Sequence, residues 1–273
     1  MKYYPTVLSI AGSDSGGGAG IQADIKAISA TGGYAATAIT AVTIQNTLGV
    51  EGVFPVSPEV ISAQIASVLT DIGAKAVKIG MLHSSAVIEA VRETLDRFNV
   101  TNIVLDPVMV STSGHRLIEE DSIATLQEKL LTRARVITPN VPEAELLSGR
   151  KITSQAQLPD VARQLSQQGR VSVLMKAGHL SDERLVDIFY NAEEDHCIEL
   201  VSRRCSSPNT HGTGCTLSSA FASYLAQDYS LDDAAQAAKA YISQAIESGA
   251  NYQIGHGHGP VNHFFSLTDA KPR

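Results

Sequence analysis

Short apolar runs that favour β-strands alternate with longer amphipathic helical patterns along the whole chain. Nine runs are expected to be strands: Thr6–Ala11, Ala35–Val42, Val50–Val56, Ala76–Gly80, Asn102–Asp106, Arg135–Thr138, Val171–Lys176, Leu185–Tyr190 and Cys197–Ser202. Apolar strands separated by amphipathic helices predict an α/β fold with a mostly parallel sheet and helices on both faces. The last two runs are joined by a short polar segment and predict an antiparallel hairpin at one edge.

The chain is expected to form a single domain, 1–273, because no low-complexity linker, charge block or repeat divides it. Its 21 Lys and Arg against 28 Asp and Glu give a net charge of -7. That balance argues against nucleic acid or an anionic membrane as the main partner. Three cysteines without a CxxC pair fit a reducing, cytoplasmic location. The apolar run Val7 to Ala11 is too short for a signal peptide or membrane span.

The segment 209–215 places Gly212 and Gly214 on either side of Thr213, directly before an apolar helical pattern. Glycines allow a tight turn, and a helix that starts there aims unpaired N–H groups and its positive dipole end at one point. Such a site can hold a phosphoryl group. Cys215 would lie at its edge, where the pKa of a thiol tends to fall below about 8.5. The alternative is a glycine-rich turn before a core helix, with Cys215 a small buried side chain.

Unusual polar segments follow several of the predicted strands. They are Gly12–Gly20, Thr43–Thr47, Asp106–Met109, Pro139–Glu143 and Lys176–His179. Ligands of open parallel sheets gather beyond the carboxyl ends of the strands, so these segments predict a binding site at that edge. The glycine-rich segment 12–20 matches neither the GxxxxGK[ST] nor the GxGxxG pattern, and a flexible turn is its alternative interpretation.

Three side chains are individual candidates for this site. Asp24 lies three residues after Ile21 and four before Ile28, so it shares the buried face of its helix. Buried carboxylates are rare unless they are paired or used. The amide of Gln45 offers a donor and an acceptor, which suits the edge of a heteroaromatic ring, although a loop hydrogen bond is the alternative. Lys176 ends a buried strand and is expected to contact a phosphate.

Two further groups concern metal binding. Glu143 lies in a predicted first helical turn, where acids are stabilised in any case, and with Asn140 it would hold Mg²⁺ through water near phosphates. His256, His258 and His263 have no carboxylate or cysteine at ligand spacing. A C-terminal loop shaped by Gly and Pro is therefore favoured over a metal site there.

Together these segments resemble the hydroxymethylpyrimidine/phosphomethylpyrimidine kinases of thiamine biosynthesis, within the ribokinase-like superfamily. The matching segments cover nearly the whole chain: AGSDSGGGAGIQADIK, TAITAVTIQNTLGV, VKIGML, VLDPVMV, ITPNVPEAELL, NTHGTGCTLSSA and GHGHGPVNHF. Among these segments, the motifs HGTGC, AGIQAD and QNT are specific to this family. The wider superfamily usually has an aspartate base where Cys215 stands, so the cysteine marks this branch. Cys205–Pro208 departs from the more charged lead-in of many relatives.

The resemblance implies a three-layer α/β/α domain, a homodimer, and ATP with Mg²⁺. It also implies two phosphorylations, first of the 5-hydroxymethyl group of 4-amino-5-hydroxymethyl-2-methylpyrimidine and then of that monophosphate. The anion hole would comprise Gly212, Thr213, Gly214 and Cys215, with Cys215 as base. The pyrimidine site would comprise Gln45, Asp24, Val42, Met81 and Val108. Lys176, Asn140 and Thr210 would contact the ATP phosphates, and Glu143 and Asp106 would attend the metal.

Two alternative functions are weighed against this one. A pyridoxal/pyridoxine kinase of the same branch would also act on a ring that carries a 5-hydroxymethyl group. Some of those kinases use a cysteine in the loop after the DPVMV segment, whereas Ser111–His115 contains none, which favours the pyrimidine. A pyrimidine- or B6-binding regulator without catalysis is the other alternative, and the presence of Cys215, Lys176 and Glu143 argues against it.

Overall fold

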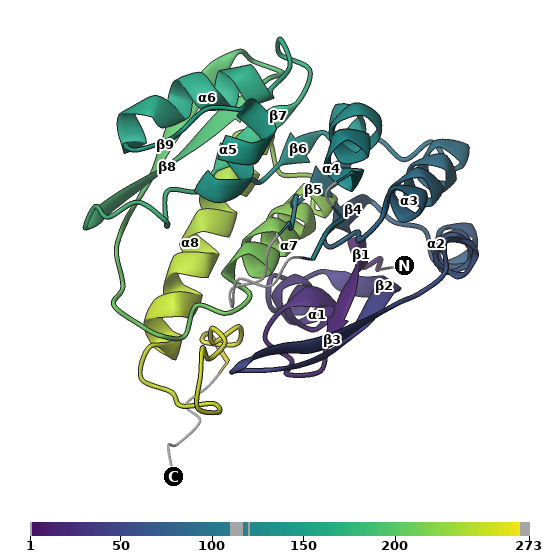
Figure 1. Cartoon of the computed structure of the whole chain (residues 1–273), viewed down its shortest axis with the longest axis horizontal. Coiled ribbons are helices and arrows are strands. Elements are labelled where there is room, and N and C mark those ends of the chain that lie inside the picture. The colour runs from purple at the N-terminus through teal and green to yellow at the C-terminus, as the bar shows by residue number, and fades with distance from the viewer. Residues whose placement is uncertain (1, 110–116, 120, 268–273) are drawn as a thin grey trace.

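The computed structural model describes residues 2–109, 117–119 and 121–267 (Figure 1). The strands within these residues are β1 (Thr6–Asp14), β2 (Tyr34–Asn46), β3 (Gly49–Pro55), β4 (Ala76–Ile79), β5 (Ile103–Leu105), β6 (Val136–Ile137), β7 (Ser172–Met175), β8 (Arg184–Asn191) and β9 (His196–Arg203). The α-helices are α1 (Gly20–Ala30), α2 (Pro58–Asp71), α3 (Ser85–Arg97), α4 (Ser122–Thr125), α5 (Val141–Ser148), α6 (Leu158–Leu165), α7 (Thr213–Ala226) and α8 (Leu231–Gly249). Each of the nine predicted runs thus overlaps a strand.

The strands form one sheet in the order β3-β2-β1-β4-β5-β6-β7-β8-β9. Neighbours from β2 to β7 are parallel, and the predicted antiparallel hairpin is confirmed as β8 and β9. The chain continues from β1 to β2 on one side and returns to β4 on the other. The carboxyl ends of β1 and β4 therefore border the point where the strand order reverses, which is where open α/β sheets bind ligands.

β8 is also antiparallel to its other neighbour β7. At the opposite edge, β2 and β3 form an antiparallel pair that was not predicted. Strand β2 continues to Asn46 rather than ending at Val42, so only Thr47 and Leu48 separate it from β3. A two-residue connection joins antiparallel neighbours, because a parallel pair needs a long crossover. Gln45, expected in a loop, is consequently held on an extended strand.

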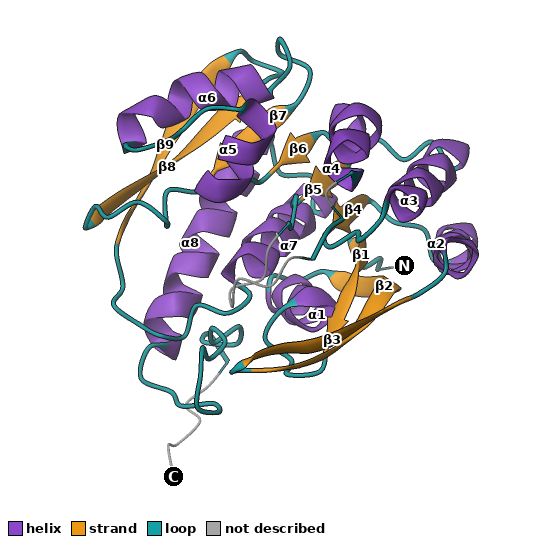
Figure 2. Cartoon of the chain, viewed as in Figure 1, coloured by secondary structure: helices purple, strands orange, loops and turns teal. Residues whose placement is uncertain are grey.

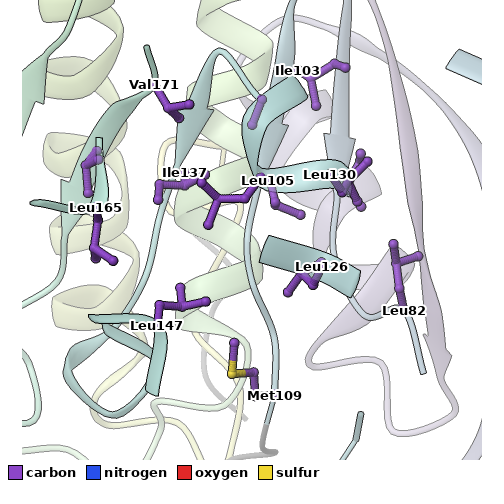
Figure 3. Packing of buried hydrophobic residues seen from close by; sticks show 14 of the residues in the cluster. Leu82, Ile103, Leu105, Met109, Leu126, Leu130, Ile137, Leu147, Leu165 and Val171 are labelled. Carbon is purple, nitrogen blue, oxygen red and sulfur yellow. The ribbon is translucent and has the colours of Figure 1, made fainter. Parts of the chain in front are cut away.

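Helices cover both faces of the sheet (Figures 1 and 2). On one face α2 to α6 pack against Ile103 and Leu105 of β5, and Figure 3 shows these side chains among their neighbours. On the other face α1, α7 and α8 pack against Val104 of the same strand. Alternate residues of a strand point to opposite faces, so a strand covered on both sides is apolar throughout. No helix among the described residues is both long and apolar enough to cross a bilayer.

Candidate active site

A cavity of about 1530 Å³ opens at the carboxyl ends of β1, β4, β5 and β7, beside the start of α7. Twelve of the fourteen predicted site residues line it: Gln45, Met81, Asp106, Val108, Asn140, Glu143, Lys176, Thr210, Gly212, Thr213, Gly214 and Cys215. These residues come from six segments of the chain that are distant in sequence. The topology thus brings the predicted segments to one place, while Asp24 and Val42 do not line the cavity.

The start of α7 presents backbone donors to this cavity. Gly212 precedes the helix with φ +76°, and the first-turn N–H of Thr213 bonds to the carbonyl of Thr210 at 3.3 Å. The N–H groups of Gly214 and Cys215 have no hydrogen-bond partner among the described residues. Unpaired first-turn donors and the positive end of the helix dipole together favour an anion. This geometry supports the predicted anion hole.

Two glycine loops interlock beside that helix start. A Cβ atom at Gly212 would lie 1.8 Å from the carbonyl oxygen of Gly18, and one at Gly18 would lie 2.3 Å from Cδ2 of His211. Nε2 of His211 lies 2.8 Å from Oδ2 of Asp14, which also accepts N–H bonds from Gly18 and Ala19. The loop after β1 therefore fixes the loop before α7 by contacts that tolerate no side chain at Gly18 or Gly212.

Asp14 determines how His211 and Gln45 are hydrogen-bonded. Burial opposes ionisation of Asp14, but the hydrogen bonds from His211 and Ala19 hold its pKa below the usual value. An ionised carboxylate only accepts, so Nε2 of His211 carries a hydrogen and donates it. Nε2 of Gln45, 3.4 Å from the same nitrogen, cannot donate to it, while Oε1 of Gln45 accepts from Thr43 at 3.1 Å. The amide N–H donors of Gln45 are thus available to a ligand in the cavity.

Asp106, Lys176 and Glu143 form a charged group beside the start of α7. Oδ1 of Asp106 accepts from Lys176 at 3.0 Å and from Thr138 at 2.9 Å. A Cβ atom at Gly214 would lie 3.3 Å from Nζ of Lys176, so the ammonium group reaches the start of α7. Burial disfavours the charge on Lys176, but Asp106 and Glu143 outweigh it and raise its pKa above the usual value. Lys176 is therefore a permanent cation beside the anion hole.

Asn140 and Glu143 have a structural role that the sequence interpretation did not assign. The side chain of Asn140 accepts from the N–H of Glu143 at 2.9 Å, and the Glu143 carboxylate accepts from the N–H of Asn140 at 2.8 Å. This capping box starts α5. Burial and the nearby Asp106 raise the pKa of Glu143 to about 7, against the opposing effect of Lys176. Two buried carboxylates with one lysine fit a divalent cation, because it would relieve their mutual repulsion.

Asp24 is buried as predicted, but its oxygens are already occupied. They accept from Nζ of Lys78 at 2.8 and 2.9 Å, from Ser9 at 2.6 Å and from Ser219 at 2.7 Å. The expected contact between Asp24 and a pyrimidine therefore has no support in the structure, because no acceptor oxygen is left for the ring. Val42, the other predicted residue outside the cavity, lies on the outer face of β2 with 48% of its surface exposed.

The expectation that the pKa of Cys215 falls is wrong. Loss of water around the thiol raises its pKa to about 11. The Lys78 ammonium and an N–H bond from Gly20 oppose this rise, while Asp24 and Asp106 add to it. The helix start lowers a thiol pKa only where solvent or a cation outweighs desolvation. Cys215 is thus a protonated thiol at neutral pH.

The C-terminal segment closes over the tip of the β2–β3 hairpin. The N–H of His258 donates to the carbonyl of Thr47 at 2.9 Å, and a Cβ atom at Gly257 would lie 2.0 Å from that carbonyl oxygen. Nε2 of His263 is buried 2.9 Å from the hydroxyl of Thr216 in α7. The glycines in this segment allow its backbone to lie against the hairpin, which agrees with the predicted Gly- and Pro-shaped loop.

Sequence comparison shows the family to which the chain belongs. The profile of the family described as Phosphomethylpyrimidine kinase matches residues 14–262. A hydroxymethylpyrimidine/phosphomethylpyrimidine kinase of Rhizobium meliloti is 48% identical over 258 residues, which cover 94% of this chain and 96% of the relative. The chain belongs to the phosphomethylpyrimidine kinase family.

Solved structures extend the comparison to the fold. A phosphomethylpyrimidine kinase from Clostridium difficile is 43% identical with a TM-score of 0.77, over 88% of this chain and 99% of that one. A pyridoxal kinase from Bacillus subtilis, solved as an ADP complex, is 34% identical with a TM-score of 0.88, over 97% and 100%. The predicted ribokinase-like α/β/α fold is thereby confirmed for this member of the phosphomethylpyrimidine kinase family.

The sequence interpretation missed Lys78, Asp14 and His211. A lysine inside the apolar run of β4 was the available signal for Lys78, since packing alone gives no reason for a charge there. Asp14 and His211 are 197 residues apart, so no local pattern predicts their contact. The loop Ser111–His115, which was used to favour a pyrimidine over pyridoxal, lies outside the described residues.

Proposed function

We propose that this kinase transfers the γ-phosphoryl group of ATP to 4-amino-5-hydroxymethyl-2-methylpyrimidine, and then a second phosphoryl group to the monophosphate. The proposal is carried by the start of α7, whose free N–H groups at Gly214 and Cys215 face a cavity that also holds Lys176. Phosphoryl transfer is accelerated mainly by positioning and by stabilising the charge on the transferring group. Names of relatives and the ADP bound to the related pyridoxal kinase support this chemistry.

Each part of the site has a task in this reaction. The N–H donors of Gln45 would bind a ring nitrogen of the pyrimidine and hold its hydroxymethyl group toward α7. Lys176 and the first-turn N–H groups would stabilise the equatorial oxygens of the transferring phosphoryl. Cys215 would take the proton of the alcohol as the new P–O bond forms. Asp106 and Glu143 would hold Mg²⁺, which supplies positive charge to the phosphates when bound.

Pyridoxal is the second candidate substrate, because the pyridoxal kinase from Bacillus subtilis superimposes with a TM-score of 0.88. Steady-state kinetics with the hydroxymethylpyrimidine, its phosphate and pyridoxal would separate the candidates. We expect the highest kcat/KM for the first two. Gln45→Ala should raise the KM for the pyrimidine far more than that for ATP, since an unpaired buried ring atom costs about 1–3 kcal/mol. Turnover of pyridoxal alone, or equal KM changes for both substrates, would contradict this assignment.

We also propose a homodimer formed through the outer face of β2 and β3. Val42, Ile44 and Phe54 are each about half exposed on this face, which is opposite to the one that carries Thr43 and Gln45. Phe54 pairs with Val42 across the strands, and a Cβ atom at the intervening Gly52 would contact both Phe54 and Ile44. An apolar patch of this kind on a sheet edge favours association with another copy.

The double variant Ile44→Asp, Phe54→Asp tests this interface. Each apolar side chain contributes about 1.5–3 kcal/mol when buried, so charging both copies should weaken the dimer at least about 100-fold. Sedimentation equilibrium would show wild-type dimers and variant monomers at the same concentration. Val60→Asp on α2, 51% exposed and outside the hairpin, is the matched control and should remain dimeric. A monomeric wild type, or a dimeric double variant, would exclude this interface.

A further inference from the structure

Lys78 is a charged residue in the middle of a core strand, and the reaction described above leaves it without a task. Its side chain and that of Asp24 are both completely buried, and the two form an ion pair at 2.8 Å. Ser9 and Ser219 complete the acceptor capacity of Asp24. Three other elements, β1, α1 and α7, therefore hold the partner of Lys78 in one position.

Core stability does not account for this ion pair. Replacing a buried pair by apolar side chains of similar volume is often neutral or stabilising, because removal of two charges from water offsets their attraction. The neighbours of Lys78 in β4 are Ala76, Val77 and Ile79, so an apolar residue would continue the strand without interruption. Packing therefore does not explain the charge at position 78, and the groups that surround the Lys78 ammonium explain it better.

The side chain of Lys78 borders the same cavity as Cys215. An ammonium group has three N–H donors, and the Asp24 carboxylate lies on one side of it. On another side lies Gly80, and a Cβ atom at that position would be only 2.8 Å from Nζ of Lys78. The absence of a side chain at Gly80 therefore leaves space for the ammonium group. Ser219, which donates to the same carboxylate, lies one helical turn after Cys215 on the same face of α7, so the ammonium group and the thiol are close. Because Lys78 is fully buried, water screens its charge little.

Four charged groups act on Cys215 from the elements around it. Lys78 of β4 and Lys176 after β7 favour the thiolate, whereas Asp24 of α1 and Asp106 after β5 disfavour it. Among these groups Lys78 has the largest effect on the pKa of Cys215 and opposes the rise caused by desolvation. Lys176 forms an ion pair with Asp106 at 3.0 Å and faces the phosphate site. Lys78 is therefore the buried cation that remains to interact with the sulfur of Cys215.

We propose that Lys78 is a positioning residue whose buried ammonium group stabilises the thiolate of Cys215, and that Asp24, Ser9 and Ser219 fix that ammonium group in place. This inference rests on the proposed function, in which the Cys215 sulfur receives the proton of the substrate alcohol. It also gives Asp24 a task other than the pyrimidine contact that the family resemblance implied. Asp24 keeps Lys78 charged in a place where an unpaired lysine would lose its proton.

Alkylation of Cys215 by iodoacetamide tests the proposal without ATP or pyrimidine, so its outcome does not depend on the proposed kinase activity. The full-length chain with Cys197→Ser and Cys205→Ser leaves Cys215 as the single thiol. Only the thiolate reacts, so the rate between pH 7 and 10 reports its fraction. In this background Lys78→Met should lower the rate at pH 8 at least about tenfold, one unit of pKa. Lys78→Arg, which keeps a cation, should lower it less.

Lys78→Met leaves Asp24 unpaired and can fail to fold, which the double variant Lys78→Met, Asp24→Asn avoids by removing both charges. It should react at least about threefold more slowly than the background, because Lys78 affects the thiol more than Asp24 does. The matched control is Lys239→Met, Asp187→Asn, which neutralises a pair of 2.7 Å elsewhere on the cavity wall. A double variant that folds and reacts as fast as this control would overturn the proposal and leave the Lys78 pair a structural feature.

Discussion

Replacing Gly212 by alanine is expected to lower kcat for both phosphorylations by about 10²–10³, the loss typical of removing one donor from an oxyanion hole. Two independent features of the structure predict this. Gly212 adopts φ +76°, where a side chain is strained, and its Cβ would lie 1.8 Å from the carbonyl oxygen of Gly18. The backbone must move to relieve that overlap, and the movement displaces the first turn of α7 with its free N–H groups.

Gly73→Ala provides a matched control for the strain alone. Gly73 has φ +73° at the end of α2, and no atom lies within 4 Å of the Cβ that alanine would add. This variant should lose about 1–2 kcal/mol of unfolding free energy and retain wild-type kinetics. Comparing kcat and thermal unfolding of both variants separates the two effects. Wild-type turnover by folded Gly212→Ala protein would show that the contact with Gly18 does not position the anion hole.

The arrangement of layers and most of the sheet could be predicted because alternating apolar runs carry that information locally. The antiparallel pairing of β2 with β3 could not, since the polar and apolar residues from Thr43 to Asn46 resemble a loop until the two-residue turn is known. The parallel core needs no such detail, because strands buried on both faces are recognisable from their composition alone.

The site was predictable where a residue's position in the chain determines its environment. Gly212 to Cys215 form the start of α7 and Lys176 directly follows β7, and both positions border the cavity. Asp24 shows the limit of this approach. Its burial followed from helical spacing, but its partner Lys78 is 54 residues away, and only the fold shows that the carboxylate is already paired. The pKa of Cys215 likewise depends on desolvation by distant segments.

Cys215→Ala should separate the two phosphorylations. The variant retains the backbone N–H groups of α7 and removes only the proton acceptor, an effect of about 10²–10⁴ where general-base help matters. Phosphorylation of the neutral alcohol should therefore fall steeply. Phosphorylation of the monophosphate should fall much less, because its nucleophile is already an anion. Cys205→Ala, which removes another thiol from the same cavity, is the control and should leave the ratio of the two steps unchanged.

The pH dependence follows from the pKa of about 11 for Cys215. Below that pH the thiol is mostly protonated, and the thiolate fraction rises about tenfold per unit. If the thiolate is the base, kcat/KM for the alcohol should rise with pH between 7 and 10 in the wild type. Cys215→Ala should lose this rise. Cys215→Asp should recover part of the activity, with a kcat/KM that does not change with pH in this range. The profile for the monophosphate should lack the slope throughout. Equal losses in both steps would mean that Cys215 acts through geometry, because a base is needed only where the nucleophile carries a proton.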